Sequence, residues 1–288
     1  MGSASSSPAS RPAGAQAERE FAFTDHDFER VRTFIYSRAG IALNATKKDM
    51  VYGRLVRRLR ELKLPNFAVY LDYIESSAGA KELEPCVNAL TTNLTYFFRE
   101  EHHFKILTDY VKTLTTQSEI TVWCAAASTG EEPYSIAMCL LEAMLGIAHA
   151  PKIQVIATDL DTSVLRHGET GIYLDDAVAK LPPTLAKRYF DKQADGRWQA
   201  KDILRERIQF RQLNLIEENW PLRQVFDAIF CRNVMIYFDR ATQLAVLNHF
   251  APLVKPKGLL FVGHSENFYQ ASPRFHLLGK TAYERVGD

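Results

Sequence analysis

The stretch CAAASTGEEPYS, residues 124–135, joins a short apolar run, ITVW at 120–123, to a helix-like segment, SIAMCLLEAML at 135–145. A turn of small residues between a strand and a helix lets the backbone approach a ligand closely. Glu131 and Glu132 suit the first turn of a helix, where the helix dipole favours negative charge. The same carboxylates would repel a phosphate, so we predict a ligand that is uncharged or cationic at this end.

Composition places the chain among ordinary globular proteins. Of its 288 residues 47% are hydrophobic and 24% are charged, and no apolar run approaches the length of a membrane span. The net charge of +1 gives no overall field that would attract nucleic acid or a membrane surface. The four cysteines show no CxxC spacing, so we expect a cytoplasmic protein with reduced, buried thiols, no disulfide and no metal site: Cys86, Cys124, Cys139 and Cys231.

The N-terminal part contains helix patterns only. Residues 1–19 are rich in Ser, Ala and Pro and predict a disordered tail, whereas 20–92 predict a small all-α domain. Its first helix should begin after Thr24 and end at Gly40. Residues 93–117 then predict a connector followed by a long helix.

From residue 118 to 288 apolar strand patterns alternate with helix patterns. This alternation predicts a doubly wound α/β sheet, closed by an antiparallel pair near the C-terminus. The alternation of strand and helix patterns is interrupted at about 172–212. A turn at Asp195-Gly196 predicts a hairpin there, and RIQFRQLN at 207–214 predicts a further strand of the same small β insertion.

Polar residues stand where four of the predicted strands end. Because ligands of open α/β sheets bind beyond the carboxyl ends of the strands, this edge is the candidate site. The chain has neither GxxxxGK[ST] nor GxGxxG, which argues against a bound nucleoside triphosphate, NAD or FAD. An adenosine ligand without phosphate fits better. S-adenosylmethionine is the common one, and its sulfonium is compatible with the acidic helix start.

Four segments together resemble the chemotaxis protein-glutamate O-methyltransferases (the CheR family): ALTTNLTYFFRE at 89–100, CAAASTGEEPYSIA at 124–137, FDAIFCRNVMIYFD at 226–239 and GLLFVGHSEN at 258–267. The resemblance implies a Rossmann-like S-adenosylmethionine-dependent methyltransferase domain with an inserted antiparallel β subdomain, preceded by an all-α domain. It also implies methyl transfer from S-adenosylmethionine to glutamate side chains of chemoreceptors, with S-adenosylhomocysteine as the product.

Site residues follow from this resemblance. Arg99 and Tyr237 are the catalytic candidates, which would orient the carboxylate or the methyl donor. Without the resemblance, Tyr237 is better explained as a core aromatic residue and Arg99 as an ordinary charge at a helix start. Adjacent His102 and His103 should point to different sides of a helix, and we expect no metal ligation by them. The resemblance implies cofactor contacts from Asn93, Thr95, Arg99, Ala126, Glu132, Asp159, Asn214, Leu215, Arg232 and Asn233.

The segment 47–63 carries seven basic residues against two acidic ones, a local net charge of +5. Arg54, Arg57 and Arg58 share one helix face beside the leucine stripe. Such faces are usually just solvated, but this one lacks interspersed acids, so we predict docking of an acidic helical partner. By the resemblance that partner is the cytoplasmic methylation region of a chemotaxis receptor.

The β insertion is a second candidate contact with a receptor, and two rival functions remain open. Some members of the family bind a receptor's C-terminal peptide at the β subdomain by strand addition, which makes that insertion a second candidate contact. One rival is a nucleic-acid methyltransferase, but no Asn/Asp-Pro-Pro-aromatic motif follows the strand ending at Cys231. A non-enzymatic cofactor-binding scaffold is the other rival. We expect a monomer that neither binds nucleic acid nor inserts into a membrane.

Overall fold

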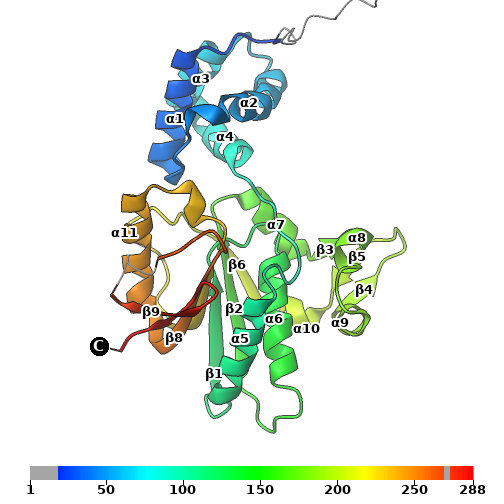
Figure 1. Cartoon of the computed structure of the whole chain (residues 1–288). Helices are drawn as coiled ribbons and strands as arrows, with labels where there is room; N and C mark the ends of the chain where they lie inside the picture. Colours follow the sequence, from blue (N-terminus) through cyan, green and yellow to red (C-terminus); the bar gives the residue numbers. More distant parts are fainter. Residues whose placement is uncertain (1–18, 269–272, 288) are drawn as a thin grey trace, which may run out of the picture.

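The computed structural model describes residues 19–268 and 273–287. A helical domain lies above the strand ends of an α/β domain, and a small β unit projects from the side of the latter (Figure 1). The predicted disordered tail falls outside the described residues except for Arg19. Among the helices of the described segments, none has the length and apolarity to cross a membrane.

The helical domain packs four helices around one apolar core. α1 begins with a reciprocal cap, in which Thr24 and Asp27 each accept a backbone hydrogen bond from the other, and it ends at Gly40 as predicted. The predicted stripe of α2 is buried at Val51, Leu55 and Leu59. Between α3 and α4 the chain forms a 3-10 helix. The bounds are α1 Asp25–Ala39, α2 Lys48–Leu62, α3 Phe67–Glu75, η2 Ser77–Glu82 and α4 Leu83–Leu90.

The α/β domain is built on a seven-stranded sheet in the order β6-β2-β1-β7-β8-β10-β9. The first five strands in this order run parallel, whereas β10 is antiparallel to both β8 and β9. The predicted doubly wound sheet and terminal antiparallel pair are therefore confirmed. The bounds are β1 Glu119–Cys124, β2 Lys152–Asp159, β6 Ile208–Gln212, β7 Phe226–Cys231, β8 Val254–Val262, β9 Phe275–Gly279 and β10 Ala282–Arg285.

Helices cover both faces of this sheet and bury them in two apolar clusters. In β1, Val122 and Cys124 belong to the cluster under α5 and α6, whereas Trp123 belongs to the cluster under α11, as strand alternation requires. All four cysteines are free and buried, as predicted. The covering helices are α5 His102–Val111, α6 Glu131–Ala143, α7 Thr162–Thr170 and α11 Arg240–Phe250.

The small β unit contains three short antiparallel strands in the order β3-β5-β4. The hairpin predicted at Asp195-Gly196 lies between β4 and β5, and Gly196 has a φ of 84°. The prediction for 207–214 was wrong in one respect: β6 pairs in parallel with β2 and extends the main sheet, where Ile208 joins the core. The unit comprises β3 Ile172–Tyr173, α8 Asp175–Val178, α9 Pro183–Tyr189, β4 Phe190–Lys192 and β5 Trp198–Ala200.

The helical domain touches the α/β domain next to the strand ends. The Ala42 backbone N–H donates to the Tyr237 carbonyl at 2.8 Å, and Asn214 Nδ2 donates to the Arg38 carbonyl at 2.8 Å. The Tyr36 hydroxyl donates to Asp239, the N-cap residue of α11, at 2.6 Å. The end of α1 is thus held against the segment that follows β7.

Candidate active site

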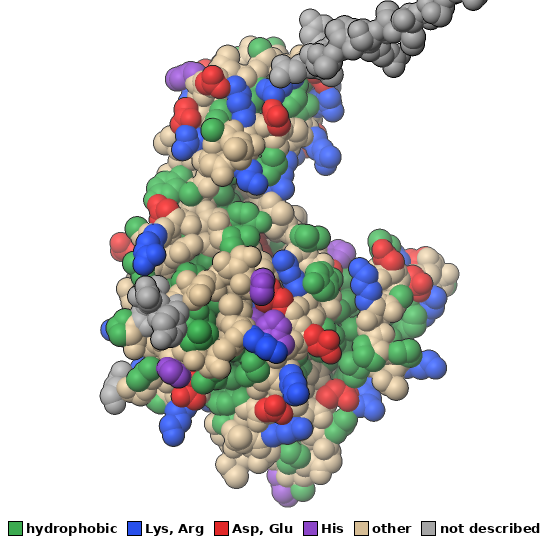
Figure 2. Space-filling view, viewed as in Figure 1, with side chains coloured by type: hydrophobic (Ala, Val, Ile, Leu, Met, Phe, Trp, Pro, Cys, Tyr) green, Lys and Arg blue, Asp and Glu red, His purple; other side chains and the backbone are tan. Residues whose placement is uncertain are grey.

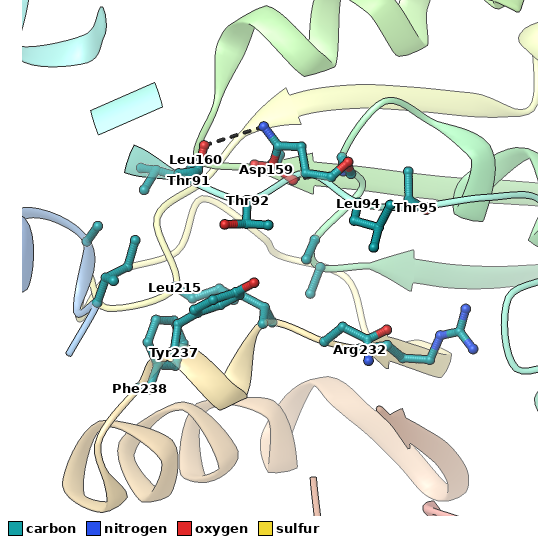
Figure 3. Close-up of a pocket in the computed structure, with 18 of the residues that line it drawn as sticks. Thr91, Thr92, Leu94, Thr95, Asp159, Leu160, Leu215, Arg232, Tyr237 and Phe238 are labelled. Atoms are coloured by element: carbon teal, nitrogen blue, oxygen red, sulfur yellow. Dashed lines mark hydrogen bonds between the residues drawn. The ribbon is translucent and has the colours of Figure 1, made fainter. Parts of the chain in front are cut away.

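A pocket lies between the two domains, at the carboxyl ends of the parallel strands (Figure 3). The space between atoms within it is about 900 Å³, a figure that includes open solvent at its mouth. The walls come from the end of α1, from the connector before α5, and from the loops after β1, β2, β6 and β7. This is the edge at which open α/β sheets bind ligands.

Every residue predicted to contact the cofactor, together with Tyr237, lines this pocket. The structure therefore brings together side chains from five separate segments, although that proximity does not establish their individual roles. They are Asn93, Thr95, Arg99, Ala126, Glu132, Asp159, Asn214, Leu215, Arg232, Asn233 and Tyr237.

The sequence analysis missed the contribution of the helical domain. Ala39 and Ile41, at the end of α1, form part of the pocket wall, together with Leu160, Leu213 and Phe238. These apolar side chains, with Leu215, suit the face of a purine ring. Only the break of the helix pattern at Gly40 marks this region in the sequence, and such a break carries no information about which domain will pack against it.

Asp159 ends β2 and lines the pocket. Its carboxylate accepts backbone hydrogen bonds from Ser128 at 2.8 Å and from Asp161 at 3.0 Å. Burial raises the pKa of Asp159, whereas these N–H groups favour the ionised form. Each carboxylate oxygen can accept a further hydrogen bond, so a ligand hydroxyl can be accommodated.

The loop from Ala125 to Gly130 approaches the pocket in a constrained conformation. Gly130 is the N-cap of α6 and has a φ of 100°, and a Cβ built on it would lie 2.6 Å from the Tyr173 hydroxyl. Two residues that line the pocket adopt positive φ without being glycine, Ser128 at 48° and Asn233 at 59°. So do Phe98 at 54° and Glu100 at 56°, on either side of Arg99. Such backbone conformations cost about 1–3 kcal/mol each and are concentrated at functional sites.

Glu132 forms a buried ion pair with Arg232. Nε of Arg232 donates to Glu132 Oε2 at 2.7 Å, and NH2 donates to the same oxygen. Both side chains are almost fully shielded from solvent. The charge of Glu132 is therefore matched within the protein by Arg232. Because of this pairing, Glu132 would not repel a phosphate as the sequence alone predicts.

Arg232 is further connected to α5. Its NH1 donates to the Arg99 carbonyl at 2.6 Å and to Nδ1 of His103 at 3.1 Å. Because Nδ1 accepts, Nε2 of His103 carries the proton and donates to the Lys280 carbonyl at 2.8 Å. Burial, reinforced by Arg232, lowers the pKa of His103 to about 4, so the ring is neutral at pH 7.

The expectation that His102 and His103 point to different sides was wrong. Their ring centroids are 4.2 Å apart, and Nε2 of His102 also lies 3.1 Å from the Lys280 carbonyl, because both rings meet the loop between β9 and β10. With Glu100 they form a group with metal-ligand chemistry within the described residues. However, both ring nitrogens of His103 are engaged, and the Arg232 guanidinium lies 3.8 Å from Glu100 Oε2, which disfavours a further cation there.

The two catalytic candidates meet the pocket from opposite sides. Tyr237 ends the 3-10 turn Met235–Tyr237 after β7, and its hydroxyl points into the pocket below Thr92 (Figure 3). Arg99 belongs to the connector, where NH1 donates to the Leu94 carbonyl at 2.8 Å and the guanidinium lies 5.9 Å from the Tyr96 ring centre. Both side chains are half-buried.

The basic residues of α2 differ in how much of their charge is available. Arg54 donates to the carbonyls of Leu90 and Thr91, where α4 ends, and Arg58 pairs with the buried carboxylate of Glu82. Arg57 is exposed and carries no comparable contact among the described residues. The basic face of α2 was predicted to lack neighbouring acids. In the structure Glu82, which is distant in sequence, lies beside Arg58.

A doubly wound sheet with this pocket at its strand ends has the architecture of S-adenosylmethionine-dependent methyltransferases. The family model described as "CheR methyltransferase, SAM binding domain" matches residues 93–284, and "CheR methyltransferase, all-alpha domain" matches residues 26–91. The chain therefore belongs to the CheR methyltransferase family.

Individual relatives agree with this assignment. The chain is 48% identical over 283 residues to a chemotaxis protein methyltransferase of Klebsiella aerogenes, covering 96% of each protein. It is 47% identical to the chemotaxis protein methyltransferase of Escherichia coli K12, covering 93% of each. Among solved structures, an O-methyltransferase family protein from Burkholderia thailandensis is similar with a TM-score of 0.35 and 15% identity, over 71% of this chain and 47% of that one.

Proposed function

We propose that this protein transfers the methyl group of S-adenosylmethionine to glutamate side chains of chemotaxis receptors, forming methyl esters during sensory adaptation. The observation that carries the proposal is the convergence of the predicted cofactor residues with Arg99 and Tyr237 on one interdomain pocket. The relatives named as chemotaxis protein methyltransferases support the biological context.

The pocket suits the proposed cofactor in two ways. Its apolar part, near Ile41 and Leu215, fits an adenine ring, whereas the carboxylate of Asp159 fits ribose hydroxyls. When bound, the cofactor would supply an electrophilic methyl group on a sulfonium. The Arg232–Glu132 pair would then hold the shape of the pocket rather than neutralise the ligand.

The chemistry requires no general base. A glutamate side chain has an intrinsic pKa of about 4.3 and is already ionised at neutral pH. When a carboxylate takes a methyl group from a sulfonium, two charges become two neutral groups, so exclusion of water favours the reaction. The main task of the protein is therefore to align the carboxylate oxygen with the methyl group.

We assign this alignment to Arg99 and Tyr237. A guanidinium that held both oxygens of the substrate would reduce their nucleophilicity. One NH1 donor of Arg99 is bonded to the Leu94 carbonyl, and we propose that its remaining donors hold a single oxygen of the substrate. The Tyr237 hydroxyl, which points into the pocket, can donate to the same carboxylate or orient the methyl donor.

The receptor would approach from the hollow side of the molecule. Figure 2 shows the surface hollowed between the helical domain and the small β unit, with basic side chains over α2 beside the hollow. We propose that exposed Arg57, with Arg54 and Arg58 beside it, contacts an acidic helix there. A C-terminal receptor peptide added to the small β unit is a second candidate contact. These partners place the working protein in the cytoplasm, and we propose that it acts as a monomer.

The direct test uses radiolabelled S-adenosylmethionine with receptor-containing membranes. Label that appears on the receptor and is released by mild base indicates a methyl ester and supports the proposal. Label on nucleic acid would favour a nucleic-acid methyltransferase. Binding of S-adenosylhomocysteine without any transfer would favour a non-enzymatic scaffold.

A further inference from the structure

Glu266, in the turn after β8, is a buried carboxylate to which the reaction proposed above assigns no role. Only 3% of its surface is exposed. Its oxygen Oε2 accepts the backbone N–H of Gly263 and that of Asn233, the latter at 3.0 Å, and Oε1 accepts the backbone N–H of Ile236 at 3.1 Å. One side chain from the β8 loop thus binds two points of the loop after β7.

These two points frame the segment that carries Tyr237. Asn233 lies at its beginning, with a φ of 59° that a non-glycine residue seldom adopts without support. Ile236 lies immediately before Tyr237, in the 3-10 turn closed by the hydrogen bond from Tyr237 N–H to the Val234 carbonyl at 3.1 Å. The loop is therefore fixed at both ends by a single carboxylate.

The surroundings leave little freedom for this contact to rearrange. A Cβ built on Gly263 would lie 2.8 Å from the Asn233 nitrogen and 2.8 Å from Glu266 Oε2, so only glycine permits the two loops to approach this closely. Burial raises the pKa of Glu266, and the three N–H groups oppose that shift by stabilising the carboxylate. Hydrogen bonds to an ionised acceptor are about twice as strong as neutral ones.

We propose that Glu266 is a positioning residue for methyl transfer: by binding the backbone at Asn233 and Ile236, it holds the Tyr237 hydroxyl at the pocket. This inference rests on the proposed function, because it assigns Glu266 an effect through Tyr237. Glu266 itself is not one of the residues that line the pocket.

The test compares Glu266→Gln with the wild type. Whichever way the amide is turned, the backbone N–H of Ile236 or those of Gly263 and Asn233 lose their acceptor and face an NH2 group. We expect kcat to fall about tenfold or more at saturating receptor and cofactor, while the KM for receptor changes less than threefold.

Asp227→Asn is the matched control. Asp227 is also a buried carboxylate and accepts the backbone N–H of Thr121 at 2.9 Å, but it lies at the other end of β7. The control should lose stability and keep kcat.

A double-mutant cycle with Tyr237→Phe separates positioning from general structural damage. If Glu266 acts through the Tyr237 hydroxyl, Glu266→Gln should lower kcat much less in the Tyr237→Phe background. Equal fold losses in both backgrounds, or a wild-type kcat for Glu266→Gln, would overturn the inference and leave the proposed function intact. If Tyr237→Phe itself keeps full turnover, the assigned role of Tyr237 fails and the inference about Glu266 fails with it. Should Glu266→Gln not fold, Glu266→Asp, which keeps the charge with a shorter reach, takes its place in the same cycle.

Discussion

Arg232 and Glu132 form a buried ion pair at the base of the pocket, with Nε of Arg232 2.7 Å from Oε2 of Glu132. Arg232 follows β7 and Glu132 opens α6, so the pair connects the loops on neighbouring strand ends. Through the Arg99 carbonyl, Arg232 also reaches the connector that carries a catalytic candidate. One guanidinium thus joins three of the segments that line the pocket.

Breaking this pair should destabilise the protein more than removing it altogether. Glu132→Gln removes the hydrogen-bonded carboxylate from the buried guanidinium of Arg232 and leaves it only Glu100, at 3.8 Å, and breaking such a pair costs about 3–5 kcal/mol. The combined variant Glu132→Gln with Arg232→Met should regain part of that stability, because the guanidinium that lost its partner is no longer there. Urea unfolding checks both. A double variant that is less stable than Glu132→Gln would contradict this account of the pair.

Removing either catalytic candidate should lower turnover without unfolding the protein. Tyr237→Phe deletes one hydroxyl that points into the pocket, and Arg99→Ala deletes a half-buried guanidinium. We expect kcat to fall about tenfold or more for each, which corresponds to about 1.4 kcal/mol of lost transition-state stabilisation. Affinity for S-adenosylhomocysteine, measured by calorimetry, should change less in Tyr237→Phe than its kcat does. Full turnover in both variants would remove the assignment.

The basic face of α2 should separate into docking and structural residues. Arg57→Glu reverses an exposed charge, so methylation should weaken several-fold at low salt and less at high salt, with the midpoint of unfolding nearly unchanged. Arg58→Glu instead places a carboxylate beside the buried Glu82, so the helical domain should lose stability. Methylation rates at two ionic strengths and thermal unfolding test this division. Unchanged rates for Arg57→Glu would refute the docking claim.

His103 should make folding stability sensitive to acid. Its pKa is about 4 in the folded protein and about 6.5 in the unfolded chain, so between these values the unfolded state binds more protons. The contribution of His103 is therefore complete above pH 6.5 and is lost as the pH falls towards 4. From pH 7 to pH 5 the loss is about 2 kcal/mol.

Urea unfolding of wild type and His103→Gln at both pH values measures this loss. The glutamine variant is less stable at pH 7 but should lack the His103 part of the pH dependence. Parallel pH curves for the two proteins would contradict the assignment of a neutral, buried His103.

Much of this architecture is readable from local patterns, since the helix start at Thr24 and the alternation from β1 onward depend on neighbours in sequence. The strand β6 was assigned to the wrong sheet because its pattern at 208–212 specifies a strand but not its partner. Pairing with β2 depends on how the inserted β unit returns the chain to the sheet edge. Local sequence does not encode that path.

The candidate site also combines features that the sequence predicts with contacts that only the folded chain forms. Residues in the long motifs, such as Glu132 and Asn233, were placed at the pocket through the family resemblance, as was Asp159 outside those motifs. The contact between Arg58 and Glu82, 24 positions apart, and that between Arg232 and Glu132, 100 positions apart, arise only when the chain folds. These pairings changed the interpretation of the charges, because a carboxylate that looks available in the sequence can already have a cation beside it.

The proposed methylation of receptor glutamates is tested by finding which residue carries the transferred methyl group. Purified protein, S-adenosylmethionine and a receptor cytoplasmic fragment would be incubated together, and peptides from the fragment sequenced by tandem mass spectrometry. We expect added methyl groups on glutamate side chains of the receptor helices. Mild base should remove them, and the Tyr237→Phe variant should form fewer of them. Methyl groups on another residue type, or a receptor that stays unmodified while the protein binds S-adenosylhomocysteine, would contradict it.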